Sequence, residues 1–185
     1  MAYIDLGLDE TTLPGITGLM AYRPETGQAL NALADALLVA PSSLARGDRE
    51  LIAAYVSGLN DCSFCAGSHS AFAAAQLDEG MPLVEQVRAD PDAAPITPKL
   101  RALLRIAGAV QRGGRDGTPK LIEAARTEGA TDVEVHDTVL IAAAFCMFNR
   151  YVDGLGTFVP TDSVSYERSA AVIVAHGYAA TAAQL

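Results

Sequence analysis

The sequence predicts a protein built from α-helices. Its first periodic segment, Gln28–Val39, carries apolar residues every three to four positions, as along the buried face of a helix. Helix start and stop signals bound the later segments, and no stretch alternates convincingly with the two-residue period of a strand. We therefore expect an all-α helical bundle, since 185 residues of which 50% are apolar suffice for one core.

The first 25 residues differ from the rest of the chain. Prolines and glycines interrupt them without a helical period (Pro14, Gly15, Gly18 and Pro24). We expect residues 1–25 to form an extended arm that lies over the body or over a neighbouring subunit. Residues 26–185 then form a single all-helical domain, and its first helix is stopped by Pro41.

A helical hairpin is expected next, with helices over Asp48–Leu59 and Cys62–Leu77. Three weak helix formers in close succession separate the two segments (Gly58, Asn60 and Asp61). Either Asp61 or Ser63 could cap the second helix.

Capping signals define the remaining helices. Thr97-Pro98 and Thr118-Pro119 each combine an N-cap with a proline at the first helical position, and Thr131 with Glu134 matches a capping box. The predicted helices are Leu83–Ala89, Pro98–Gln111, Pro119–Glu128, a long core helix from the Thr131 cap to about Val152, and Tyr166–Ala175.

A shift of 84 residues aligns several positions and points to two pseudo-symmetric helical halves. The aligned pairs are Asp48 with Asp132, Glu50 with Glu134, Cys62 with Cys146, and Phe64 with Phe148. In this alignment the helix-break-helix region corresponds to residues 135–152. The second copy has Asn149 and Asp153 where the first has Cys65 and His69, so it has lost their chemistry.

The charge and hydropathy of the chain limit the classes of molecule that it is expected to bind. The net charge is -9 and the 13 Lys and Arg form no basic run, which argues against nucleic acid and anionic membranes. The apolar run Val139–Phe148 is too short to span a bilayer. The acidic N-terminus lacks the pattern of a signal peptide, so we expect a cytoplasmic protein that binds a small neutral substrate or a protein.

Cys62, Cys65 and His69 carry the strongest chemical signal. Their spacings of three and four residues place all three on one face of a helix. Side chains three residues apart lie ~5 to 6 Å from each other, so the two thiols can close a disulfide. Such a short loop would gain only roughly 2 kcal/mol of stability, and a redox role explains the spacing better.

Glu50 lies twelve residues before Cys62. On one unbroken helix it would stand ~18 Å away, but the hairpin brings it to within ~4.5 Å of the level of His69 along the axis. A relay from Glu50 through His69 to a cysteine is then geometrically possible. From the residues alone, a metal site of Cys62, Cys65, His69 and Glu50, or mere packing of the thiols, stays open.

The Glu50, Cys62, Cys65 and His69 pattern resembles the alkylhydroperoxidase D and carboxymuconolactone decarboxylase-like superfamily, whose redox members share these spacings. The segment FNRYVDGLGTFVP, residues 148–160, is similar to its peroxidase-related branch. The resemblance covers most of residues 28–180. It implies the helical bundle of that family, a homo-oligomer such as a trimer or hexamer, and no cofactor.

The resemblance also implies a thiol-dependent peroxidase. Cys65, with a pKa lowered by His69 and the helix N-terminus, would attack a hydroperoxide and be captured by Cys62 as a disulfide. Glu50 would orient His69 as the base. A dithiol, lipoyl or thioredoxin-like reductant would reset the pair.

Two other functions stay open. The insert between the cysteines is Ser63-Phe64, where alkylhydroperoxidase D often has a histidine, so the chain could instead be a disulfide oxidoreductase without peroxide turnover. A non-catalytic metal-binding assembly module is the second alternative. Lactone decarboxylation is disfavoured, because the decarboxylases lack the cysteine pair.

Overall fold

The computed structural model describes residues 1–115 and 117–182, and within these ranges it is helical and without strands. Residues 183–185 of the expected domain lie outside the described residues. The helices are α1 (Ile16–Tyr22), α2 (Pro24–Leu38), α3 (Arg46–Leu59), α4 (Ser63–Ala74), α5 (Gly80–Ala89), α6 (Pro98–Gln111), α7 (Thr118–Thr127), α8 (Asp132–Leu155) and α9 (Ser163–Ala182). The all-α prediction is confirmed.

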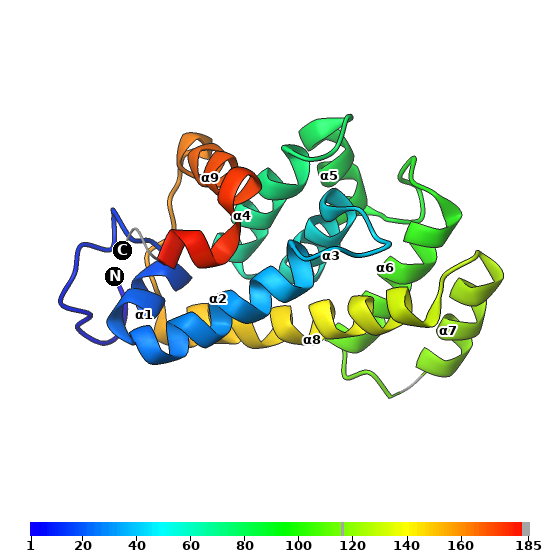
Figure 1. Cartoon of the computed structure of the whole chain (residues 1–185), viewed down its shortest axis with the longest axis horizontal. Coiled ribbons are helices and arrows are strands. Elements are labelled where there is room, and N and C mark those ends of the chain that lie inside the picture. Colours follow the sequence, from blue (N-terminus) through cyan, green and yellow to red (C-terminus); the bar gives the residue numbers. More distant parts are fainter. Residues whose placement is uncertain (116, 183–185) are drawn as a thin grey trace.

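The longest helix, α8, packs against most of the other helices. Figure 1 shows it running along most of the molecule, with α2 beside one half and α6 and α7 at the other end. The α3–α4 hairpin packs against α8, and α9 packs across α4 and α2. The N-terminal arm and the end of α9 therefore meet at the same end of the molecule.

The predicted capping box starts α8. The Glu134 amide donates to the Thr131 hydroxyl at 3.2 Å, and the Thr131 amide donates to the Glu134 carboxylate at 2.8 Å. By length and composition, α8 is the one described helix that could cross a membrane. However, it contributes residues such as Ile141 and Phe145 to the buried core, and we interpret it as the core helix of a globular domain.

The α3–α4 hairpin forms where the sequence predicts it, but its cap differs. Asp61 has a φ of 56° and turns the chain, and Cys62 occupies the N-cap of α4. No side-chain cap bond is present there, so the expected capping by Asp61 or Ser63 is wrong. The left-handed turn places the first cysteine at the cap, leaving Ser63 as the first helical residue.

The N-terminal arm is not extended throughout, because α1 forms within it. Leu19 is buried in the protein, and this burial outweighs the weak helix propensity of the glycines nearby. The residues before α1 lie over the body. The Tyr3 amide donates to the Leu155 carbonyl at 2.7 Å, and the Phe158 amide donates to Glu10 at 3.0 Å.

The second half does not repeat the hairpin of the first. Its expected helix-break-helix region, residues 135–152, lies inside the uninterrupted α8. The break formers Gly58, Asn60 and Asp61 correspond to residues 142, 144 and 145, which are alanine, alanine and phenylalanine. Nothing at these positions interrupts a helix.

Some of the remaining boundaries differ from the prediction. Thr118 is the first residue of α7 and Gly117 is its N-cap, so the predicted Thr118 cap is wrong. The helices predicted from Gln28 and Leu83 begin earlier, at Pro24 and Gly80, so that α2 starts within the predicted arm.

The α6 helix spans the expected residues, and the Thr97 hydroxyl accepts from the Leu100 amide at 3.2 Å. The last helix is longer than expected, because the chain resumes helical structure after a kink at Gly177. This kink sets the direction of the last part of α9.

Candidate functional site

The hairpin brings Glu50 of α3 against His69 of α4. The Glu50 Oε2 and His69 Nδ1 atoms are 2.7 Å apart. Glu50 is fully buried, and His69 is nearly so. The separation agrees with the hairpin geometry expected from the sequence. A buried carboxylate fixes the orientation of the imidazole ring.

Tyr178 of α9 binds the other oxygen of Glu50. Its hydroxyl donates to Oε1 at 2.7 Å, and its ring stacks on His69 with the centroids 6.2 Å apart. Burial first, and then the charge of Glu50, raise the pKa of Tyr178 well above its usual value, so the phenol stays protonated and donates. The sequence did not single out Tyr178, because no spacing rule connects it with residues more than 100 positions earlier.

Tyr178 reaches Glu50 because α9 is kinked at Gly177. The φ and ψ of Gly177 are 77° and -176°, a region that essentially only glycine adopts. Asp35 of α2 accepts from the Tyr178 amide at 2.6 Å and from the Ala179 amide at 2.8 Å. Arg46 of α3 donates to the Val174 carbonyl at 3.2 Å. These side chains replace the helical hydrogen bonds that the kink removes.

Cys65 lies in the first turn of α4 and Cys62 at its N-cap, and both are free, buried thiols. The Cys62 thiol raises the pKa of Cys65 first, and burial raises it further, whereas the amide of Asn149 lowers it. The net direction is upward, so the expected low pKa of Cys65 is wrong for the reduced pair. The sequence signal, a histidine one turn on, does not report the burial of the thiol.

Asn149 of α8 is held in place beside the cysteines. It is buried, accepts from the Asn60 amide at 2.8 Å and donates to the Ser57 hydroxyl at 3.1 Å. In the 84-residue shift Asn149 is the counterpart of Cys65, and that alignment could have drawn attention to it. Cys146 is half-buried beside Asn60 and has no cysteine partner among the described residues.

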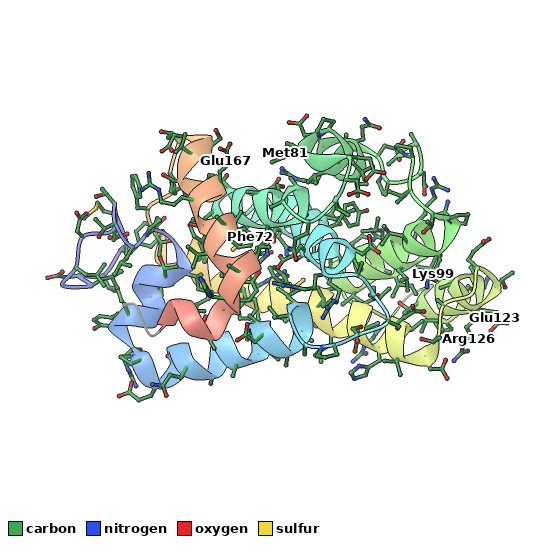
Figure 2. All side chains as sticks on the ribbon, turned by 45° about the horizontal axis from the view of Figure 1, so that its top comes forward. Phe72, Met81, Lys99, Glu123, Arg126 and Glu167 are labelled. Carbon is green, nitrogen blue, oxygen red and sulfur yellow. The ribbon has the colours of Figure 1, made fainter. Side chains whose placement is uncertain are left out.

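A cavity of about 360 Å³ opens onto Cys65 and His69, and Cys62 does not line it. Its walls come from the arm, α1, α2, α4, α8 and α9, and most of the lining side chains are apolar. Phe72, which Figure 2 shows in the interior between α4 and α9, packs its ring 5.1 Å from that of His69. Of the two sulfurs, Cys65 is therefore the one that a ligand in the cavity can reach.

The hydrogen bonds of Glu50 affect whether this residue could bind a metal ion. Both oxygens of Glu50 already have hydrogen-bond partners, and one of these partners is His69 Nδ1. Within the described part of the chain, no group of three or more His, Cys, Asp and Glu side chains could hold a metal ion.

One family model and several solved structures are similar to this chain. The Carboxymuconolactone decarboxylase family profile matches residues 24–79. A crystal structure described as the alkylhydroperoxidase AhpD core, an uncharacterized peroxidase-related protein from Ralstonia eutropha JMP134, has 28% identity and a TM-score of 0.75 over 83% of this chain and 79% of its own. No curated protein matches the chain.

Two further solved structures share the fold. An uncharacterized peroxidase-related protein from Silicibacter sp. TM1040 has 25% identity and a TM-score of 0.75, covering 85% of this chain and 82% of its own. A protein of unknown function from Agrobacterium tumefaciens, described as a putative antioxidant defence protein AhpD, has 24% identity and a TM-score of 0.67 over 78% and 97% of the two chains.

The kink predicts an unequal response of two glycines to substitution. Gly177→Ala should destabilise the protein by ~1 to 3 kcal/mol more than Gly129→Ala. Both glycines have positive φ, but a Cβ at Gly177 would meet Asp35 Oδ1 at 2.8 Å, whereas a Cβ at Gly129 would lie in open space. Urea unfolding of both variants measures the difference. Equal losses would contradict the tight kink.

Proposed function

The chain belongs to the alkylhydroperoxidase D and carboxymuconolactone decarboxylase-like superfamily, and on that premise we propose that it is a thiol-dependent peroxidase. One observation carries the proposal. Cys65 and His69 line one cavity, and the fully buried Glu50 holds the Nδ1 side of the His69 ring. A proton on Nδ1 that is donated to Glu50 leaves Nε2 free to act as a base.

The first half-reaction oxidises Cys65. His69 accepts the thiol proton, directly or through water, and the thiolate attacks the terminal oxygen of the hydroperoxide. The O–O bond breaks, the alkoxide takes the proton and leaves as an alcohol, and Cys65 becomes a sulfenic acid. General-base help is needed because burial and Cys62 raise the pKa of Cys65.

The second half-reaction uses Cys62, which stands three residues earlier at the N-cap. Its sulfur attacks the sulfenic acid, a disulfide forms and water leaves. A dithiol then reduces the disulfide by exchange. Because both sulfurs are buried, we propose that this reductant is a small dithiol or one carried on a lipoyl-type arm, rather than the surface of a folded protein.

The need to reduce the cysteine pair after each turnover indicates where the protein works. A cycle that returns both cysteines to free thiols suits a reducing compartment, and we propose the cytoplasm.

A disulfide oxidoreductase without peroxide turnover would need the same cysteines but no hydroperoxide. Loss of two thiols per chain on addition of peroxide supports the peroxidase, whereas thiols that react only with disulfides would support the alternative.

The two cysteines should respond differently to substitution. Cys62→Ser should still consume one equivalent of hydroperoxide and accumulate a sulfenic acid, because Cys65 faces the cavity. Cys65→Ser should do neither. Mass spectrometry after trapping the sulfenic acid measures both results, with Cys146→Ser as the control that behaves like the wild type. The reverse pattern would exchange the two roles.

Glu50 and His69 should act as one unit. Glu50→Gln and His69→Gln should each slow oxidation of Cys65 at least about tenfold, and the double variant should be little slower than the worse single, because both residues serve one proton transfer. Stopped-flow oxidation by peroxide measures these rates. Glu134→Gln, another buried carboxylate remote from the cysteines, controls for general damage and should leave the rate unchanged.

The rate at which peroxide oxidises Cys65 should depend on pH, because the pKa of this thiol is raised. At neutral pH the thiol form dominates, so the thiolate fraction rises about tenfold per pH unit until the pKa is reached. Alkaline pH should therefore restore much of the rate that the Glu50 and His69 variants lose. Multiplicative losses in the double variant, or a flat response to pH, would remove the relay from the mechanism.

We also propose that the protein is a homo-oligomer, a trimer or hexamer. Three apolar residues seven positions apart are exposed on α8 (Val133, Leu140 and Met147). This spacing produces an apolar seam along one helix face that suits packing against another subunit. Light scattering at micromolar concentration should give a mass several times that of one chain, and a reduced mass for Leu140→Glu. A monomeric wild type would disprove the assembly.

A further inference from the structure

Asn149 of α8 contacts Cys65 without lining the cavity. Its side-chain amide is hydrogen-bonded to the Cys65 thiol, and Cys65 lines the cavity whereas Asn149 does not. Val152, about one turn after Asn149 on α8, packs in one buried cluster with Cys62 and Cys65. This face of α8 therefore lies against the start of α4, and the amide reaches the sulfur without occupying the space in which a ligand would bind.

The effect of Asn149 on the sulfur depends on which end of its amide faces Cys65. The NH2 group of an amide donates and would stabilise a thiolate, whereas the carbonyl oxygen would repel it. A chain of hydrogen bonds fixes this choice, and it begins at a backbone carbonyl. Gln111 Nε2 donates to the Leu59 carbonyl at 3.2 Å. Because a carbonyl can only accept, the NH2 group of Gln111 must lie on this side.

The orientation then passes from one amide to the next. The same nitrogen of Gln111 donates to Asn60 Oδ1 at 3.0 Å. Since this occupies the oxygen of Asn60, its Nδ2 faces Asn149 and donates to Asn149 Oδ1 at 2.8 Å. The oxygen of Asn149 is thus turned toward Asn60, and its Nδ2 donates to the Ser57 hydroxyl at 3.1 Å. The NH2 group of Asn149 is therefore the end that is left for Cys65.

This NH2 group can serve two acceptors at once. It carries two hydrogens, of which Ser57 takes one. The other is available to Cys65, whose hydrogen bond with Asn149 lowers the pKa of the thiol. Ser57 stands at the same place, because its carbonyl accepts from the Cys62 amide at 3.1 Å. Asn149 is only 1% exposed, and a hydrogen bond to an ion is stronger where water is excluded.

The titratable groups around Cys65 oppose a charge on its sulfur. They come from three helices (Cys62 and His69 of α4, Asp153 of α8 and Tyr166 of α9). Cys62, burial and the carboxylate of Asp153 raise the pKa of Cys65. Burial first, and then nearby negative charges, also raise the pKa of Tyr166, so its phenol stays neutral. His69 can remove the proton of the thiol, but another group has to stabilise the charge that remains on the sulfur.

We propose that Asn149 is a catalytic residue that donates a hydrogen bond to the Cys65 thiolate while His69 takes the proton, and that Asn60 and Gln111 are positioning residues that orient its amide. This rests on the proposed peroxidase function and adds the group that stabilises its nucleophile. An amide does not release its protons, so it remains a donor before and after the thiol ionises. A fixed donor in a site without water stabilises a developing charge without having to reorient.

The test measures thiolate formation without peroxide. All variants carry Cys62→Ser, and mass spectrometry follows the alkylation of Cys65 by iodoacetamide between pH 7 and 10, since the thiolate is the form that reacts. Asn149→Leu should slow alkylation at pH 8 at least about tenfold, which corresponds to one pKa unit, and should slow oxidation by peroxide in parallel. Ser57→Ala removes the other hydrogen bond of the same nitrogen and should slow alkylation less than about twofold, although it loses stability.

Asn60→Ala tests the positioning chain at a half-buried residue at the end of α3. Without the donor that holds its oxygen, the Asn149 amide can turn, so alkylation should slow at least about twofold. Asn60→Ala combined with Asn149→Leu should be no slower than Asn149→Leu alone, because Asn60 acts through Asn149. This arm also decides the question if Asn149→Leu does not fold, since an unchanged rate in Asn60→Ala would overturn the proposal.

Two further outcomes separate this proposal from the function on which it rests. Equal slowing of alkylation by Ser57→Ala and Asn149→Leu would show that the amide acts through packing, and would overturn its role at the sulfur. The expected alkylation rates, in a protein whose Cys65 is oxidised by no hydroperoxide, would overturn the peroxidase function and support the contact of Asn149 with the thiolate.

Discussion

The buried carboxylate of Glu50 is the group on which the rest of the site depends. It lies at the meeting point of three helices, since α3 carries it, α4 brings His69 to one oxygen and α9 brings Tyr178 to the other. A carboxylate taken out of water is costly unless hydrogen bonds replace its hydration. Both partners therefore stabilise the buried carboxylate in the folded protein as well as organising the site, and loss of either leaves a buried charge short of a donor.

The support of this carboxylate extends beyond its direct partners. Tyr178 is on the far side of a helix kink, and Asp35 and Arg46 hold that kink by bonding the amide and carbonyl groups it frees. Helices α2 and α3 thus set the position of a residue in α9. This packing links the site to the cavity, because residues of α2 and α9 also form walls of the cavity that Cys65 lines.

The sequence predicts those parts of the site that are local. Glu50 and His69 belong to one hairpin, so a break near Asn60 and the helical rise are enough to bring them level. The N-terminal caps of α6 and α8 can likewise be predicted, because each involves residues only three positions apart. The prediction of a repeated hairpin failed because a few matched residues do not reproduce the break itself.

Long-range features could not be predicted in this way. Tyr178 meets Glu50 across 128 positions, and neither residue carries a signal of the other. The α1 helix forms because tertiary burial of Leu19 outweighs local propensity. The pKa of Cys65 depends on burial and on Cys62, and sequence spacing reports only the nearby histidine. The fold itself hosts different chemistries in related proteins, so function has to be argued from these contacts.

The protonation of the His69 ring tests the central claim most directly. If Glu50 organises a base for Cys65, the neutral ring must carry its proton on Nδ1, donated to Glu50, and present a free Nε2. Nitrogen NMR of the reduced protein at pH 8, with His69 assigned by comparison with His69→Gln, distinguishes the two ring nitrogens. The account predicts the Nδ1–H form. A ring protonated at Nε2 could not accept a proton from Cys65 there and would contradict it.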